Sequence, residues 1–151
     1  MPEKETLERA KQDKREGKAP STQAGEFVRE EIEHVREGKH GARSTKQAIA
    51  IGLSKARRAG VKLAPPEKGK ASEETREQAK RDTKKGQGAG RGKTSSTRSR
   101  ASSRALKREG HTAASRSALS RQARGAAARR SAASRSRSAK KAAATRKRQE
   151  A

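Results

Sequence analysis

The large apolar residues of the chain gather in two short stretches with helical spacing. In the first stretch, Val28, Ile32 and Val35 recur at intervals of four and three residues, with Phe27 beside them. This spacing places them on one face of an amphipathic helix, and charged residues fill the positions between them. The pattern predicts a helix over residues 21–36.

The second apolar stretch opens on a helix-capping signal. Ser44 and Gln47 have the spacing of a capping box, in which each side chain bonds the backbone of the other. The predicted helix continues to residue 58 and has an apolar face formed by Ala48, Ile49, Gly52, Leu53 and Ala56. We expect it to pair with the first helix as a hairpin. Because this hairpin buries few large side chains, we also expect a weak homodimer through residues 21–63.

Charged segments with helix-forming composition flank this pair. Residues 3–16 hold opposite charges four positions apart, and residues 72–85 follow a Ser cap but carry no apolar stripe. The two prolines at 65–66 end the apolar head, and the glycines of residues 86–92 indicate a linker. These boundaries predict a helical head over 1–66, a charged helix with a Gly-rich linker over 67–92, and a basic tail over 93–151.

Residues 86–151 contain almost nothing that can form a core. They hold 19 basic and 2 acidic residues, and their only large apolar side chains are Leu106 and Leu119. In the whole chain, Leu, Ile, Val and Phe account for 12 of 151 residues, far below the ~20% under which a charged chain stays disordered. The predicted fold class is therefore all-α, with a small helical head (a helix hairpin) and a largely disordered or conditionally helical basic tail.

The positive charge of the chain indicates what kind of partner it binds. The formal net charge is +24, and most of it lies in the second half of the chain. Such a charge indicates a polyanion partner, and arginine binds phosphate in a bidentate manner. With no Tyr or Trp and one Phe, the chain lacks the aromatic residues that stack on unpaired bases, which favours duplex DNA over RNA.

The resulting hypothesis is duplex-DNA binding without sequence specificity, by a nucleoid-associated or DNA-condensing protein. An RNA- or ribosome-associated basic protein and a helical protein-interaction adaptor are the alternatives. The residues expected to contact nucleic acid are basic and lie in the second predicted helix or in the tail. They are Lys46, Lys55, Arg57, Arg58, Arg98, Arg100, Arg104, Arg116, Arg121, Arg124, Arg129, Arg130, Arg135, Arg137, Lys140, Lys141, Arg146, Lys147 and Arg148.

Other functional classes find little support in the sequence. The chain has no Cys, and His34 and His40 have no Cys pair beside them, so no metal site is expected. Residues 86–94 lack the glycine that a phosphate-binding loop needs at position 87, and no catalytic set of residues stands out, so we expect no cofactor and no enzyme activity. No apolar run is long enough for a membrane span. We therefore expect a cytoplasmic protein at the nucleoid, with no membrane partner.

The block REGKHGARSTKQAIAIGLSKARRAGVKL, residues 36–63, resembles a signature of small, basic, uncharacterised bacterial proteins, a family of unknown function often labelled DNA-binding. The resemblance covers the head, about residues 1–66. The tail around residues 138–148 is similar in composition to bacterial linker-histone-like tails. The resemblance implies DNA binding but supplies no functional residues.

Overall fold

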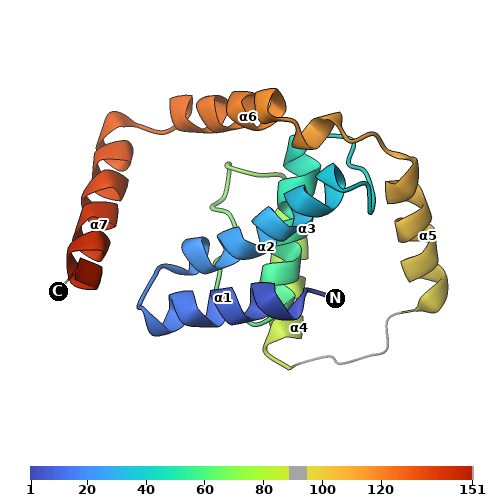
Figure 1. The fold of residues 1–151 in the computed structure, drawn as a ribbon, viewed down its shortest axis with the longest axis horizontal. Coiled ribbons are helices and arrows are strands. Elements are labelled where there is room, and N and C mark those ends of the chain that lie inside the picture. Colours follow the sequence, from blue (N-terminus) through green and yellow to red (C-terminus); the bar gives the residue numbers. More distant parts are fainter. Residues whose placement is uncertain (89–94, 151) are drawn as a thin grey trace. The chain divides into compact units, whose positions relative to one another are not determined.

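The computed structural model describes residues 1–88 and 95–150, and the elements of this part of the chain are helices (Figure 1). They are α1 (Lys4–Arg15), α2 (Pro20–Arg36), α3 (Thr45–Arg58), α4 (Glu73–Gly86), α5 (Ser96–Arg108), the 3₁₀ helix η1 (Thr112–Ala114), α6 (Arg116–Ala128) and α7 (Ala132–Glu150). The chain divides into two compact units, Met1–Ser115 and Arg116–Ala151. Residues 89–92 of the predicted linker lie outside the described residues.

Helices α2 and α3 pack closely at the centre of the first unit. Their contact surface is made from small residues: Ala24, Ala48 and Ala56 are fully buried, and Phe27 is the largest side chain in the core. A Cβ atom on Gly52 would lie only 2.6 Å from the Cα of Val28. The two helix backbones approach so closely because α3 has no side chain at this position.

The head is more than the expected helix hairpin, and that prediction is wrong. Helix α1 packs on α2, and α4 packs on α3. Leu7 and Ala10 of α1 cover the core around Phe27, whereas α4 is held through buried Ala79 and Asp82. The predicted solvated helix at 72–85 docks because Asp82 accepts a hydrogen bond of 2.6 Å from the Ser54 hydroxyl of α3, a polar contact that apolar periodicity does not reveal.

The prediction of a disordered tail is also wrong, because the chain beyond the linker is helical. The segment from α5 to η1 belongs to the first unit and is anchored there by hydrogen bonds to its backbone. The Thr45 hydroxyl donates to the Ala113 carbonyl at 2.6 Å, and the Arg36 guanidinium donates to the Ala114 carbonyl at 2.9 Å. Ala113 and Ala114 are themselves buried. Small side chains and backbone carbonyls thus provide the anchor that large apolar residues would otherwise supply.

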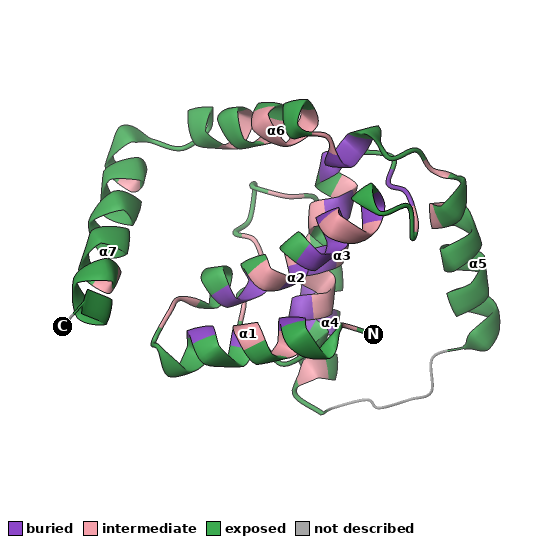
Figure 2. Ribbon diagram, in the orientation of Figure 1, coloured by how far each residue is buried: buried purple, intermediate pink, exposed green. Residues whose placement is uncertain are grey.

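The second unit is formed by α6 and α7 and contains no buried residue among those described. Both helices are rich in Ala and Arg, which have high intrinsic helix propensity. Arg135 donates to the Ala127 and Arg130 carbonyls, which joins the start of α7 to the end of α6. Figure 2 shows buried residues concentrated on α1–α4 and η1, whereas α5, α6 and α7 are mainly exposed. None of the described helices is long and apolar enough to cross a lipid bilayer.

Candidate nucleic-acid interface

Positive and negative charges are separated along the chain. Throughout the described residues, ion pairs occur only between positions 3 and 82. They neutralise most of the acidic residues of the head. From residue 96 to residue 150 the only acids are Glu109 and Glu150, and the Lys and Arg side chains there are all exposed. This part of the chain therefore presents cations that no carboxylate neutralises.

The structure distributes the predicted tail residues over three helices and one turn. Helix α5 carries Arg98, Arg100 and Arg104; α6 carries Arg116, Arg121 and Arg124; Arg129 and Arg130 lie between α6 and α7; and α7 carries Arg135, Arg137, Lys140, Lys141, Arg146, Lys147 and Arg148. Arg130 donates to the Ser134 carbonyl at 3.1 Å and also to the Ser138 hydroxyl. Each helix presents its cations in a pattern of its own.

On α5 four of the cations form one face, whereas Arg98 lies on the opposite side of the helix. Arg100, Arg104, Lys107 and Arg108 are separated by four, three and one residues, so they lie within about a third of the helix circumference. Leu106 lies on the other side of the helix and is partly buried. Lys107 and Arg108 complete this face but were missed among the predicted contact residues, although their spacing from Arg100 and Arg104 was visible in the sequence.

On α7 the cations surround the helix. At 100° per residue, Arg137, Lys140 and Lys141 share one side of the helix and Arg135 lies outside it, while the cations of residues 146–148 in the last turn point in three directions. The helix is 19 residues long, which corresponds to about 28 Å. A helix of this kind has no apolar face to pack on protein, but it suits an environment with negative charge on both sides.

The predicted contact residues of α3 differ in whether they already have partners within the protein. Lys46 is exposed in the first turn. Arg58 is also exposed, but it lies 3.5 Å from an Asp82 carboxylate oxygen and donates to the Ser54 hydroxyl at 2.8 Å. Arg58 therefore helps to hold α4 against α3.

Arg57 is buried rather than free for phosphate. Its guanidinium donates to the carbonyls of Leu63 and Ala64, both at 3.3 Å, and fixes the chain that leaves α3. Burial lowers the pKa of Arg57 from its ordinary value, because a desolvated guanidinium favours its charge less. The side chain acts as a structural cap of the loop after α3.

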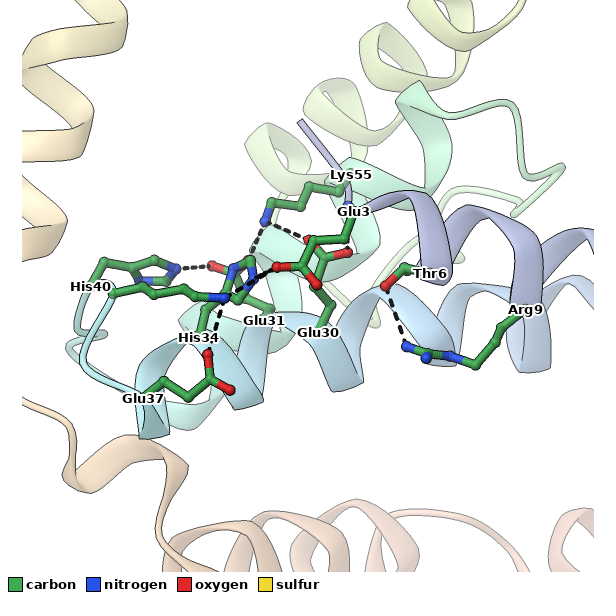
Figure 3. A network of polar contacts seen from close by, with 10 residues as sticks. Glu3, Thr6, Arg9, Glu30, Glu31, His34, Glu37, His40 and Lys55 are labelled. Carbon is green, nitrogen blue, oxygen red and sulfur yellow. Dashed lines mark hydrogen bonds and ion pairs between the residues drawn. The ribbon is translucent and has the colours of Figure 1, made fainter.

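Lys55, the remaining α3 residue, belongs to a buried polar network between α1, α2 and α3 (Figure 3). Its ammonium lies 2.6 Å from Glu31 Oε2 and 3.3 Å from Glu30 Oε1. Burial acts to raise the pKa of Glu30, but hydrogen bonds from the Glu3 backbone N–H and the Thr6 hydroxyl, together with Lys55, lower it overall. The network therefore stabilises the ionised carboxylate.

Two histidines close the other end of this network (Figure 3). His34 Nε2 lies 2.9 Å from Glu3 Oε1, and His40 Nε2 lies 3.0 Å from Glu31 Oε1. One ligand atom each from Glu31, His34 and His40 lies within 4.8 Å of the others. These residues are the ones, within the described part of the chain, that are placed to hold a metal ion together.

The comparisons with known proteins concern the head. A family of unknown function, DUF6496, matches residues 13–68. This range begins near the end of α1, includes α2 and α3 and thus contains both histidines of the network, and it ends before α4. No curated protein matches the chain, and no solved structure does. The match therefore supports a relation to an uncharacterised family.

Proposed function

We propose that this protein binds duplex DNA without sequence specificity, as a nucleoid-associated or DNA-condensing protein, through the cations of α5, α6 and α7. The observation that carries the proposal is the separation of charge: the head neutralises its carboxylates internally, whereas the later helices keep their cations exposed. Binding would release the counterions that surround DNA, and this release is the sequence-independent part of nucleic-acid affinity.

The helical form of these segments supports duplex DNA as the target. A single α-helix fits the major groove, whose two walls are lined by phosphates. Helix α7, with cations in several directions, suits such a groove, while the face of four cations on α5 suits a single backbone. Phe27 is the only Phe, Tyr or Trp of the chain and is 1% exposed, so base stacking on a single strand has no surface aromatic to use.

The homodimer expected through residues 21–63 is not needed for this proposal. It was expected because a hairpin of two helices buries few large side chains, and in the structure α1, α4 and η1 also pack on α2 and α3. Among the described residues, Met1 is the exposed large apolar side chain. The proposal therefore rests on the cations alone.

The test is the salt dependence of affinity, measured by titration of fluorescent duplex DNA with the full-length protein. The logarithm of the affinity should fall linearly with the logarithm of the salt concentration, by ~0.9 for each phosphate neutralised. Replacing Arg146, Lys147 and Arg148 together by Gln should reduce the slope by up to about 2.7 if each binds one phosphate. Circular dichroism verifies that α7 remains helical.

A matched control removes the same charge from the part of the chain in which cations form ion pairs. Arg29, Lys39 and Lys80 are exposed but paired with Glu33, Glu37 and Glu77 respectively. Replacing these three by Gln lowers the net charge equally and should leave the salt slope nearly unchanged. An equal loss of slope in both triple variants would refute the assignment to the later helices, and a slope near zero in the wild type would refute binding itself.

Competition with structured RNA tests the choice of polyanion. At equal phosphate concentration, duplex DNA should displace the labelled duplex at least as well as a hairpin RNA. A strong preference for the RNA would favour the ribosome-associated alternative and would contradict the proposal of a DNA-binding protein.

A further inference from the structure

We propose that Glu31, His34 and His40 form a binding site for a borderline divalent metal ion of the Zn²⁺ type. Two imidazoles and one carboxylate are a ligand set that suits Zn²⁺ and its neighbours, whereas Mg²⁺ and Ca²⁺ prefer sites made of oxygen. The proposal is independent of DNA binding, because none of these residues belongs to the basic helices.

The backbone holds His40 over the end of α2. Gly38, at φ +74°, reverses the chain after the helix, and the Lys39 N–H then donates to the His34 carbonyl at 3.0 Å. On the other side, the Gly41 N–H donates to the Leu106 carbonyl at 2.9 Å. The backbone of His40 is therefore held from both directions, so only side chains need to move when an ion binds.

The hydrogen bonds of His40 decide which of its nitrogens is available. Its Nδ1 lies 3.0 Å from the Gly41 carbonyl, and because a carbonyl only accepts, Nδ1 carries the proton. In a neutral imidazole, Nε2 then has a lone pair, and this lone pair faces Glu31 Oε1 at 3.0 Å. Two acceptors at this distance repel unless a cation lies between them. That cation is either a proton on His40 or a metal ion.

The remaining geometry favours the metal ion. His34 stands three residues after Glu31 on the same face of α2, and its ring meets that of His40 edge to face with centroids 6.0 Å apart. A tetrahedral ion at ~2.0–2.2 Å from each ligand requires ligand atoms roughly 3.3 Å apart. The ligand atoms here lie within 4.8 Å, so a small rotation of the rings closes the site.

Outer contacts of the site match those of known metal centres. Metal-bound histidines usually donate their second N–H to a carboxylate or a backbone carbonyl. His40 contacts the Gly41 carbonyl, and His34 contacts the Glu3 carboxylate. Glu31 is 1% exposed, while the side chains of His34 and His40 are 13% and 17% exposed. The histidine edge therefore gives an ion a path from solvent to a buried carboxylate.

The local charge also fits a divalent ion. The groups that face one another here are the carboxylates of Glu3, Glu30, Glu31 and Glu37 and the ammonium groups of Lys39 and Lys55. With neutral histidines, the carboxylates exceed the ammonium groups by two, which is the charge that a divalent ion carries.

The experiment is a titration of full-length, chelator-treated protein with Zn²⁺ by calorimetry and with Co²⁺ by visible absorption. The wild type should bind one ion and show the intense absorption of tetrahedral Co²⁺. His34→Gln and His40→Gln should each weaken binding more than about 100-fold, beyond the ~10–100-fold effect of losing an outer-shell partner. His111→Gln is the matched control, because His111 is exposed and is not one of the three ligand residues, and it should bind as the wild type does.

A second measurement keeps the proposal testable if a variant folds poorly. Zn²⁺ should raise the Tm of the wild type and of the His111 variant, whereas Mg²⁺ at the same concentration should not. Absence of one-to-one Zn²⁺ binding, or equal loss in the His111 variant, would overturn the metal site. If His40 titrates by NMR in a Glu31-dependent manner while no ion binds, the bridging cation is a proton, and the proposal is likewise overturned.

Discussion

The close crossing of α2 and α3 leads to a prediction in which one kind of substitution has two different effects. Gly25 and Gly52 both lie inside helices, in α2 and α3. Replacing a helical glycine by alanine normally stabilises the helix by ~1 kcal/mol. A Cβ on Gly25 would meet nothing within 4 Å. Gly25→Ala should therefore raise the free energy of unfolding by about 0.5–1 kcal/mol.

At Gly52 the same methyl group meets backbone. It would lie 2.6 Å from the Val28 Cα, 2.9 Å from the Val28 nitrogen and 3.0 Å from the Phe27 carbonyl oxygen. Ordinary contacts between carbon atoms are ~3.5–4.0 Å, so the helices must separate by about 1 Å. Overpacking of this kind costs about 1–3 kcal/mol. Because both variants gain the same helix propensity, the difference between them measures this cost alone.

Urea unfolding followed by circular dichroism compares the two variants. Gly52→Ala should be less stable than Gly25→Ala by about 1–3 kcal/mol, which corresponds to a difference in Tm of roughly 2–12 °C. Equal stability of the two variants would show that the helices do not cross as closely as described, and the packing argument would fail.

Two further predictions concern the network and the docked segment. The folded state lowers the pKa of Glu30 below 4.5, so the contribution of Glu30 to stability should be complete above pH 4.5 and be lost as the pH falls through its pKa in the folded protein. Glu30→Gln should therefore cost about 1.5–3 kcal/mol of unfolding free energy at pH 7. A cost that persists undiminished at pH 3 would refute this pH dependence. Gly41→Ala would place a Cβ against the Glu109 carbonyl, whereas Gly110→Ala meets nothing within 4 Å, so hydrogen exchange in α5 and η1 should accelerate in the first variant only.

The positions of the helices in the head follow from local signals that the sequence displays. The Ser44 side chain accepts from the Gln47 N–H at 3.1 Å, as the capping box predicts, and α3 ends at Arg58 just before Gly60. Such signals involve residues a few positions apart, so they can be recognised without knowing the fold. The apolar spacing of α2 is of the same kind.

The docking of the later segment could not be predicted because its contacts are distant and mostly involve backbone. Thr45 and Ala113 are 68 residues apart, and a threonine hydroxyl bonding a carbonyl leaves no trace in apolar periodicity. The fully buried residues there are alanines, whose burial contributes little per side chain and is overlooked when only large residues are counted. A composition argument therefore overestimated disorder.

The residues of the proposed metal site stand at a recognisable spacing in the sequence. The spacing Glu31-x₂-His34-x₅-His40 contains a helical pair at three residues and a third ligand after the helix end. A search for cysteine pairs passes over it, and the role of Glu31 becomes clear only when Gly38 turns His40 back toward α2. The signal was the pairing of a carboxylate and a histidine three residues apart.

The loop at residues 40–42 connects the two proposals in a way that can be measured. His40 faces the proposed ion, while the next two N–H groups, of Gly41 and Ala42, donate to the carbonyls of Leu106 and Gly110 at 2.9 and 3.0 Å. An ion that fixes His40 should therefore also hold the end of α5, whose cations we assign to DNA. Zn²⁺ should slow hydrogen exchange at Gly41 and Ala42 in the wild type and in the His111 variant but not in His40→Gln. If Zn²⁺ binds without changing exchange at these two amides, the ion and α5 act independently.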